Sequence, residues 1–324
     1  MKISVIIPVK PGGAVAALAA LKGLDHDSPD HEIIVAEGKR PSRQRNQAAK
    51  EATGEILYFL DDDALIQSDA LKRLVANFTD PHVAAIGGPS ITPSSDTPFQ
   101  RAVAWALASS LGGGAIRNRY RSVGVLRDVD DSELILCNLA FRKDVYLSFG
   151  GLDERLYPNE ENELIDRLLK SGHRLLHDPE MYVQRSQRPT LAAFVRQMKT
   201  YGKGRAEQTL ISRSLSFKAV IPALFALYLL TLPFMAFYGW YLLPGLAYAA
   251  LLAASSSQAI LKGEAAIALR LPLVYTLLHF CYGAGFISGF FAPRYKGEEV
   301  VRAEVQIKCL KEFGSCWSSK SVIS

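Results

Sequence analysis

Residues 55–63 read "EILYFLDDD", an apolar run that ends directly in three consecutive carboxylates. Three adjacent anions repel one another, and at the end of a buried strand they carry a desolvation cost unless a cation neutralises them. The triplet Asp61, Asp62 and Asp63 therefore indicates a bound cation, with a metal ion as the first candidate. The alternative is a solvated acidic turn that leads into the helix expected in "SDALKRLVANF".

The first 215 residues alternate between strand-like and helix-like segments. Apolar runs at 3–9, 31–38 and 55–63 predict strands, and "AVAALAALKGL" and "SRQRNQAAKEAT" between them predict helices. This order predicts an α/β domain built on a parallel, doubly wound sheet. Because ligands bind beyond the carboxyl ends of the strands in such sheets, Val9, Glu37 and the acidic triplet should surround one crevice.

The acidic triplet can hold a divalent metal. Side-chain direction repeats every two residues along a strand, so Asp61 and Asp63 are the expected ligands, with Asp62 pointing away or bonded to the loop. A hard cation such as Mg²⁺ or Mn²⁺ completes its shell with water and substrate phosphates. Arg43 and Arg45 follow the second strand and can pair with phosphate oxygens, unless they form an exposed helix face.

Two apolar stretches predict a membrane protein. The chain is 49% hydrophobic with a mean hydropathy of +0.09, and residues 219–255 and 271–293 contain no charged side chain. About 20 apolar residues cross a bilayer as a helix, so the first stretch has room for two passes and the second for one. We expect two or three transmembrane helices within 219–292 and a lipid bilayer as partner. Nucleic acid is not expected as a partner, and the oligomeric state stays open.

The sequences on either side of these apolar stretches predict on which side of the membrane the first domain and the tail lie. "ISVIIPVKPGG" is broken by prolines and glycines, so it reads as a strand and not as a signal peptide, which leaves the first domain cytoplasmic at the inner membrane. Residues 184–218 hold eight Lys or Arg and a single Glu, a basic amphipathic segment suited to an anionic leaflet. The amphipathic tail at 293–324 is also basic and is expected in the cytoplasm, which would make one apolar segment re-entrant or interfacial.

Several motifs in order resemble a known family. "SVIIPVK", "EIIVAEG", "RQRNQAAKEATGEILYFLDDDA" and "CNLAFRKDVYLSFGGLDERLYPNEENELIDRLLKSGHRLLHDP" resemble family 2 glycosyltransferases with the GT-A fold, over residues 1 to about 185. "PSRQRN", "YGKGR" and "HFCYGAGF" resemble the membrane-anchored, succinoglycan-type members. The resemblance implies a GT-A domain at 1–215 that is followed by the membrane helices.

The resemblance also implies site residues. The first-strand proline and its successor, beside the nucleotide base, fall on Pro8 and Val9, and the usual aspartate after the second strand is Glu37 here. The metal-binding Asp-x-Asp falls on Asp61 and Asp63. The expected nucleotide-sugar site comprises Pro8, Val9, Glu37, Arg43, Arg45, Asp61 and Asp62.

The family's Glu-Asp pair, whose second member is the usual general base, falls on Glu160 and Glu161. Glutamate is one methylene longer than aspartate, so either residue could be the base, and each anion raises the pKa of the other. The alternative is the charged first turn of a helix. Asn138 and Arg142 are expected to contact the acceptor, although a strand that turns into a helix would have the same sequence.

These expectations describe an inverting, metal-dependent transfer of a sugar from a nucleotide-diphosphate donor to a polyprenyl-linked saccharide. The Gln-x-x-Arg-Trp motif of processive synthases is absent, which favours the addition of a single sugar. A polyprenyl-monophosphate sugar synthase is the first alternative. The second is a non-catalytic membrane scaffold or sugar-nucleotide binder.

Overall fold

The structure is a computed structural model that describes residues 1–213, 215, 217–296 and 304–314. The chain divides into two compact units. Unit 1 combines Met1–Ile91 and Asn118–Arg185 with the described part of the tail, and unit 2 combines Thr92–Arg117 with Ser186–Gly297. The tail therefore belongs to the same unit as the N-terminal strands, whereas the apolar helices belong to the other.

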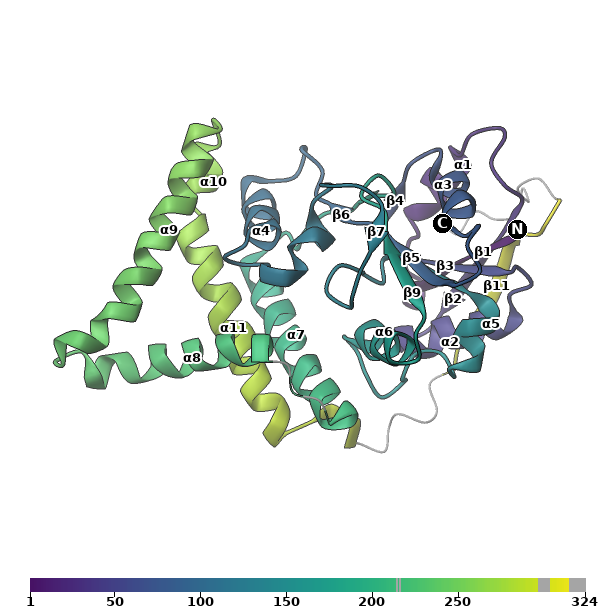
Figure 1. Cartoon of the computed structure of the whole chain (residues 1–324). Coiled ribbons are helices and arrows are strands. Elements are labelled where there is room, and N and C mark those ends of the chain that lie inside the picture. The colour runs from purple at the N-terminus through teal and green to yellow at the C-terminus, as the bar shows by residue number, and fades with distance from the viewer. Residues whose placement is uncertain (214, 216, 297–303, 315–324) are drawn as a thin grey trace. The chain divides into compact units, whose positions relative to one another are not determined.

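Unit 1 is built on an eight-stranded sheet with the order β11-β2-β1-β3-β8-β5-β9-β7 (Figure 1). Its strands are β1 (Ile3–Val9), β2 (His31–Glu37), β3 (Ile56–Leu60), β5 (Val83–Gly87), β7 (Arg127–Asp128), β8 (Asn138–Arg142), β9 (Arg174–His177) and β11 (Gln306–Lys311). The first three are parallel, as the sequence predicted. The expected α/β class and the predicted strands near 3–9, 31–38 and 55–63 are confirmed.

The sheet is mixed, and the parallel order expected from the sequence does not extend to all of its strands. Strand β8 lies antiparallel between β3 and β5, and β7 and β11 are also antiparallel to their neighbours. Asn138 at the start of β8 pairs with Leu60 at the end of β3, so the chain enters β8 from the carboxyl end of the parallel strands. The chain therefore runs back through the sheet in the opposite direction.

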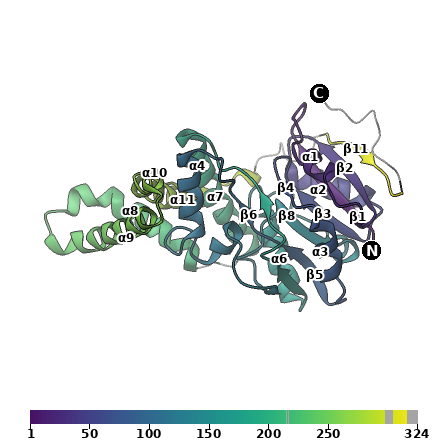
Figure 2. The same cartoon turned by 90° about the horizontal axis from the view of Figure 1, so that it is seen from above.

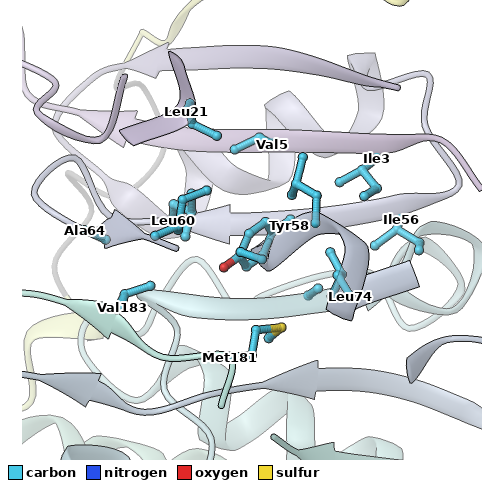
Figure 3. Packing of buried hydrophobic residues seen from close by; sticks show 14 of the residues in the cluster. Ile3, Val5, Leu21, Ile56, Tyr58, Leu60, Ala64, Leu74, Met181 and Val183 are labelled. Atoms are coloured by element: carbon cyan, nitrogen blue, oxygen red, sulfur yellow. The ribbon is translucent and has the colours of Figure 1, made fainter. Parts of the chain in front are cut away.

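Helices cover both faces of this sheet because alternate strand residues point to opposite sides. Helices α1 (Ala17–Lys22) and α3 (Ala70–Asn77) pack on the face that carries Val5, Tyr58 and Leu60 (Figure 3). Helices α2 (Pro41–Glu51), α5 (Lys143–Ser148) and α6 (Glu160–Lys170) pack on the other face. A small second sheet joins β4 (Leu65–Ile66), β10 (Val183–Gln184) and β6 (Ser90–Ile91).

Unit 2 is helical (Figure 2). Its elements are α4 (Pro98–Ala108), α7 (Leu191–Ser212), α8 (Phe217–Met235), η2 (Gly239–Leu242), α9 (Leu243–Leu261), α10 (Ala265–Ala268), α11 (Leu271–Phe291) and η3 (Arg294–Lys296), and a further 3-10 helix, η1 (Gly114–Tyr120), spans the boundary between the units. Among the described residues, α11 is the one helix long and apolar enough to cross a membrane. The structure therefore does not support the multi-pass arrangement expected from the sequence.

Candidate functional site

The carboxyl ends of β1, β2 and β3 bring the predicted nucleotide residues together. Pro8 and Val9 end β1 and pair with the last residues of β2. Glu37 ends β2, where its carboxylate accepts hydrogen bonds from the backbone N–H of Gly12 (3.0 Å) and from Nζ of Lys308 (3.0 Å). The pKa of Glu37 is lowered, first by the hydrogen bond from Lys308 and then by that from Gly12. Sequence reasoning did not identify Lys308, which comes from the tail strand β11.

The two predicted metal ligands converge on a single cation. Asp61 Oδ2 lies 3.1 Å from Nη2 of Arg185, and Asp63 Oδ1 lies 2.5 Å from Nε of the same guanidinium. Asp62 is half-buried, and its pKa is raised by burial and by the two neighbouring aspartates. Arg185 follows β10, and its backbone N–H donates to the Ile91 carbonyl at 2.9 Å. The sequence analysis counted Arg185 only as part of a basic segment.

This arrangement fits a divalent metal with few protein ligands. The carboxylates of Asp61 and Asp63 reach one positive group from the same side, and hard oxygens are the ligands that Mg²⁺ and Mn²⁺ prefer. Within the described part of the chain, no group of three or more His, Cys, Asp or Glu side chains is arranged for a metal. A metal held here would therefore take its remaining ligands from water and a substrate diphosphate.

Arg45 links the acidic triplet to the predicted catalytic pair. It lies in the middle of α2, and its side chain is 4% exposed. Nη2 of Arg45 lies 2.6 Å from Asp61 Oδ1, and Nη1 lies 3.6 Å from Glu160 Oε1. Arg43, partly buried, lies on the first turn of the same helix. The alternative of an exposed helix face is therefore wrong for Arg45, which is buried between two carboxylates.

Glu160 and Glu161 form the first turn of α6, and both are buried. Burial, and next the neighbouring Glu161 anion, raise the pKa of Glu160 to about 8, and Glu160 Oε2 has no hydrogen-bond partner among the described residues. Glu161 Oε1 lies 3.7 Å from Nη1 of Arg119, whose guanidinium also donates to Oδ1 of Asn162 (2.6 Å). At neutral pH this arrangement favours the protonated form of Glu160.

The two predicted acceptor residues have structural partners instead. Asn138 is fully buried; it accepts from the Tyr58 hydroxyl (2.6 Å) and donates to the Met181 carbonyl (2.6 Å). Arg142 ends β8 opposite the start of β3, and its guanidinium donates to three backbone carbonyls within residues 78–83. The structure therefore does not bring Arg142 to the carboxyl ends of β1–β3, and it uses both polar groups of Asn138 inside the core.

Comparisons with known proteins find sequence similarity to glycosyltransferases. Residues 14–146 match the family model described as Glycosyl transferase family 2. The chain is 28% identical over 211 residues to the succinoglycan biosynthesis protein ExoA of Rhizobium meliloti, covering 56% of this chain and 62% of that protein. It is 29% identical over 168 residues to the pre-mycofactocin glycosyltransferase of Mycobacterium tuberculosis, covering 52% and 34%. The chain thus aligns with less than two thirds of either relative.

A solved structure shares the fold. The mannosyltransferase PcManGT of Pyrobaculum calidifontis, in complex with GDP-Man and Mn²⁺, superposes with a TM-score of 0.53 over 89% of this chain and 87% of that chain. The two sequences are 18% identical, so the likeness concerns the fold alone.

Proposed function

The chain carries a family 2 glycosyltransferase domain with the GT-A fold, as its motifs predicted, and from this premise we propose its reaction. The protein transfers a sugar from a nucleotide-diphosphate donor to a hydroxyl of a polyprenyl-linked saccharide. The transfer is metal-dependent and inverts the configuration at the anomeric carbon. The observation that carries the proposal is the convergence of Asp61 and Asp63 on one cation, next to the buried pair Glu160 and Glu161. Together these groups provide a place for a diphosphate and a place for a proton acceptor.

The donor binds at the carboxyl ends of β1–β3. Pro8 and Val9 lie beside the nucleobase, and the Glu37 carboxylate accepts hydrogen bonds from its N–H groups. Asp61 and Asp63 hold the metal, which when bound stabilises the negative charge that grows on the leaving diphosphate. Arg185, released from the two aspartates, donates to phosphate oxygens, because a planar guanidinium matches their geometry. The Pyrobaculum mannosyltransferase, which has the same fold, is complexed with GDP-Man and Mn²⁺, and this supports a nucleotide sugar and a metal as the ligands proposed here.

Glu161 takes the proton of the acceptor hydroxyl. The shared burial of the two glutamates favours one proton on the pair, and the raised pKa of Glu160 assigns that proton to Glu160. Glu161 is then the member of the pair that accepts the proton, and Arg119 at 3.7 Å orients its carboxyl group without a close hydrogen bond. Arg45 holds Glu160 and Asp61 in one arrangement, so the base and the metal ligands keep a fixed separation. General base catalysis by a positioned carboxylate contributes about 10²- to 10⁴-fold.

The lipid-linked acceptor is supported by unit 2. Helix α7 carries four Lys or Arg, and α8 and α9 present exposed side chains such as Leu224, Phe234 and Leu246. A basic helix next to an apolar one suits an anionic membrane surface, where lipid-linked sugars are found. One relative is named for the biosynthesis of a polysaccharide, succinoglycan, which supports a saccharide as the acceptor. A polyprenyl phosphate as acceptor is the alternative, because it would need the same surface.

The Glu161→Gln variant distinguishes a hydroxyl acceptor from a phosphate acceptor. With a hydroxyl acceptor, turnover should fall about 10²- to 10⁴-fold while binding of the nucleotide sugar, measured by calorimetry, is retained. Glu163→Gln, in the same helix and paired with Arg167 at 2.7 Å, is the matched control and should keep normal turnover. Near-normal turnover for both Glu161→Gln and Glu160→Gln would favour the phosphate acceptor, since a phosphate is already an anion. A large loss at Glu160 alone would show that the base is misassigned.

A further inference from the structure

The tail strand determines on which side of a membrane the chain ends. Strand β11 pairs antiparallel with β2, with Gln306 opposite Glu37 and Cys309 opposite Ile34. Nζ of Lys311 donates to the His31 carbonyl at 2.6 Å, which secures the far end of the strand. A strand that completes a sheet is in the same aqueous compartment as that sheet. Residues 304–314 therefore lie on the same side of the membrane as unit 1.

This pairing restricts how the helices between residues 186 and 297 can cross a bilayer. The chain leaves unit 1 at Arg185 and re-enters it with the tail, so the number of complete crossings between these points must be even. Helix α11 is the one described helix that is long and apolar enough to cross. If α11 crossed alone, β11 would lie on the opposite side from β2. The helix selected by length and hydropathy is thus the one that cannot cross by itself.

The packing of α11 also opposes its insertion into hydrocarbon. A Cβ on Gly202 of α7 would lie 2.0 Å from the Tyr282 carbonyl of α11, and a Cβ on Gly285 would lie 2.2 Å from the Lys199 carbonyl, so the two backbones are in close contact. Arg294, just after α11, binds the buried Glu207 of α7 at 2.6 Å. Helix α7 carries five charged residues, which are costly inside a bilayer. Helix α11 therefore stays with α7 at the membrane surface, and its equally close contact with α8, where a Cβ on Gly283 would lie 2.0 Å from the Pro222 carbonyl, is at the N-terminal end of that helix.

The hairpin formed by α8, η2 and α9 is largely apolar, unlike the charged helix α7. Residues 219–261 contain no charged side chain, and charge returns only at Lys262 and Glu264. Large apolar side chains are exposed along the hairpin, including Leu224, Leu227, Leu230, Phe234, Phe237, Trp240, Leu243 and Leu246. Such a continuous apolar surface without charge suits the interior of a bilayer. Figure 1 shows α8 and α9 diverging from the η2 turn, with α11 joining their other ends.

Several polar groups at the turn of the hairpin bond to one another. The Tyr228 hydroxyl donates to the Tyr241 carbonyl at 3.1 Å and accepts from the Gly245 N–H at 3.0 Å, and the hydroxyls of Thr231 and Tyr241 are 2.6 Å apart. In hydrocarbon every backbone polar group needs such a partner, whereas a turn exposed to water does not. The turn therefore has the features of a membrane-buried segment.

We propose that α8 and α9 form a re-entrant hairpin, which enters the bilayer from the side of unit 1 and returns to that side, while α7 and α11 lie at the surface. The bilayer is the partner of the exposed apolar face, and the protein is monotopic. This inference depends on β11 and on the charge distribution, and not on the proposed glycosyl transfer.

Cysteine labelling in membranes tests the proposal. The starting protein has its native cysteines replaced by serine. Three variants of it each carry one introduced cysteine: Lys50→Cys in unit 1, Lys262→Cys after the hairpin, and Trp240→Cys at its turn. A fourth variant keeps Cys309 as its single cysteine. Leu243→Cys is a second reporter of the turn, in case the Trp240 variant does not fold. Each is treated with a membrane-impermeant maleimide in right-side-out and in inverted vesicles, before and after detergent.

The expected result is labelling of Lys50→Cys, Lys262→Cys and Cys309 from one and the same face, and labelling of the turn variants from neither face until detergent is added. Labelling of the turn from the face opposite to Lys50→Cys would overturn the re-entrant hairpin in favour of two complete crossings. Labelling of the turn from the same face would show that it is not inserted. Labelling of Cys309 from the opposite face would overturn the same-side argument.

Discussion

Replacing Glu160 by glutamine should change how the stability of the protein depends on pH. Burial and the adjacent Glu161 raise the pKa of Glu160 from 4.5 to about 8 in the folded protein. Between these two values the folded state binds a proton that the unfolded state has released. The free energy of unfolding therefore decreases as the pH rises from about 4.5 to about 8, because ionising Glu160 in its buried position is unfavourable. Glutamine has the same shape and does not ionise.

The size of the effect follows from proton linkage. When the folded state binds one proton more than the unfolded state, the free energy of unfolding falls by about 1.4 kcal/mol per pH unit. Between about pH 5.5 and about pH 7, the free energy of unfolding of wild type should therefore fall by about 2 kcal/mol relative to that of Glu160→Gln. Above about pH 8 the difference should level off, since Glu160 is then ionised in both states. Arg45 at 3.6 Å favours the ionised form, and the pKa of about 8 already includes this effect.

The assay is urea unfolding of the detergent-purified protein, followed by tryptophan fluorescence at several pH values for wild type and variant. Glu163→Gln is the control, because Glu163 lies in the same helix and forms an ion pair with Arg167, and its replacement should not produce a stability gain that increases with pH. A constant difference between wild type and Glu160→Gln from about pH 5.5 to about pH 8 would refute the raised pKa of Glu160, and with it the argument that Glu160 holds the proton of the pair.

Two further substitutions test the donor site. Asp63→Ala should lower turnover by about 10²-fold or more without unfolding the domain, because a partly exposed metal ligand is lost and no core cavity forms. Circular dichroism checks the fold, and electron paramagnetic resonance measures Mn²⁺ binding. An unchanged rate at saturating Mn²⁺ would disprove the assignment of Asp63 as a metal ligand. Lys308→Met should weaken binding of the nucleoside diphosphate by up to about fivefold, since Glu37 loses the ammonium that orients it. Lys311→Met, in the same strand, should leave the calorimetric affinity unchanged, and equal losses in both variants would indicate an effect of the strand as a whole.

Local sequence patterns were sufficient for the first half of unit 1. The runs at 3–9, 31–38 and 55–63 each form a buried strand, and the segments between them form α1 and α2, because apolar periodicity and β-branched content act within a few residues. The direction of later strands was not predictable in this way. Strand β8 has an ordinary strand sequence, and only the path of the chain before it makes β8 antiparallel.

The predicted acceptor residues show the limit of motif reasoning. "CNLAFRKDV" contains the same residues whether it faces a ligand or the core. Which applies depends on partners that lie far away in the chain, such as Tyr58 and Met181 for Asn138. The carbonyls that Arg142 binds come from the end of α3 and the loop after it, again outside the motif.

The sequence by itself determined the α/β class, the likeness to family 2 glycosyltransferases, and the presence of an acidic triplet and a glutamate pair that need a partner, because each of these is a property of residues that are neighbours in the chain. Only the tertiary structure decided which cations meet those anions. Arg45, Arg119 and Arg185 are separated from one another by more than sixty positions, yet the sheet brings their guanidinium groups to one edge. The tail strand β11 pairs with β2 for the same reason. The unpaired backbone groups at a sheet edge can bond to any strand that the fold brings beside them, whatever its distance in the sequence.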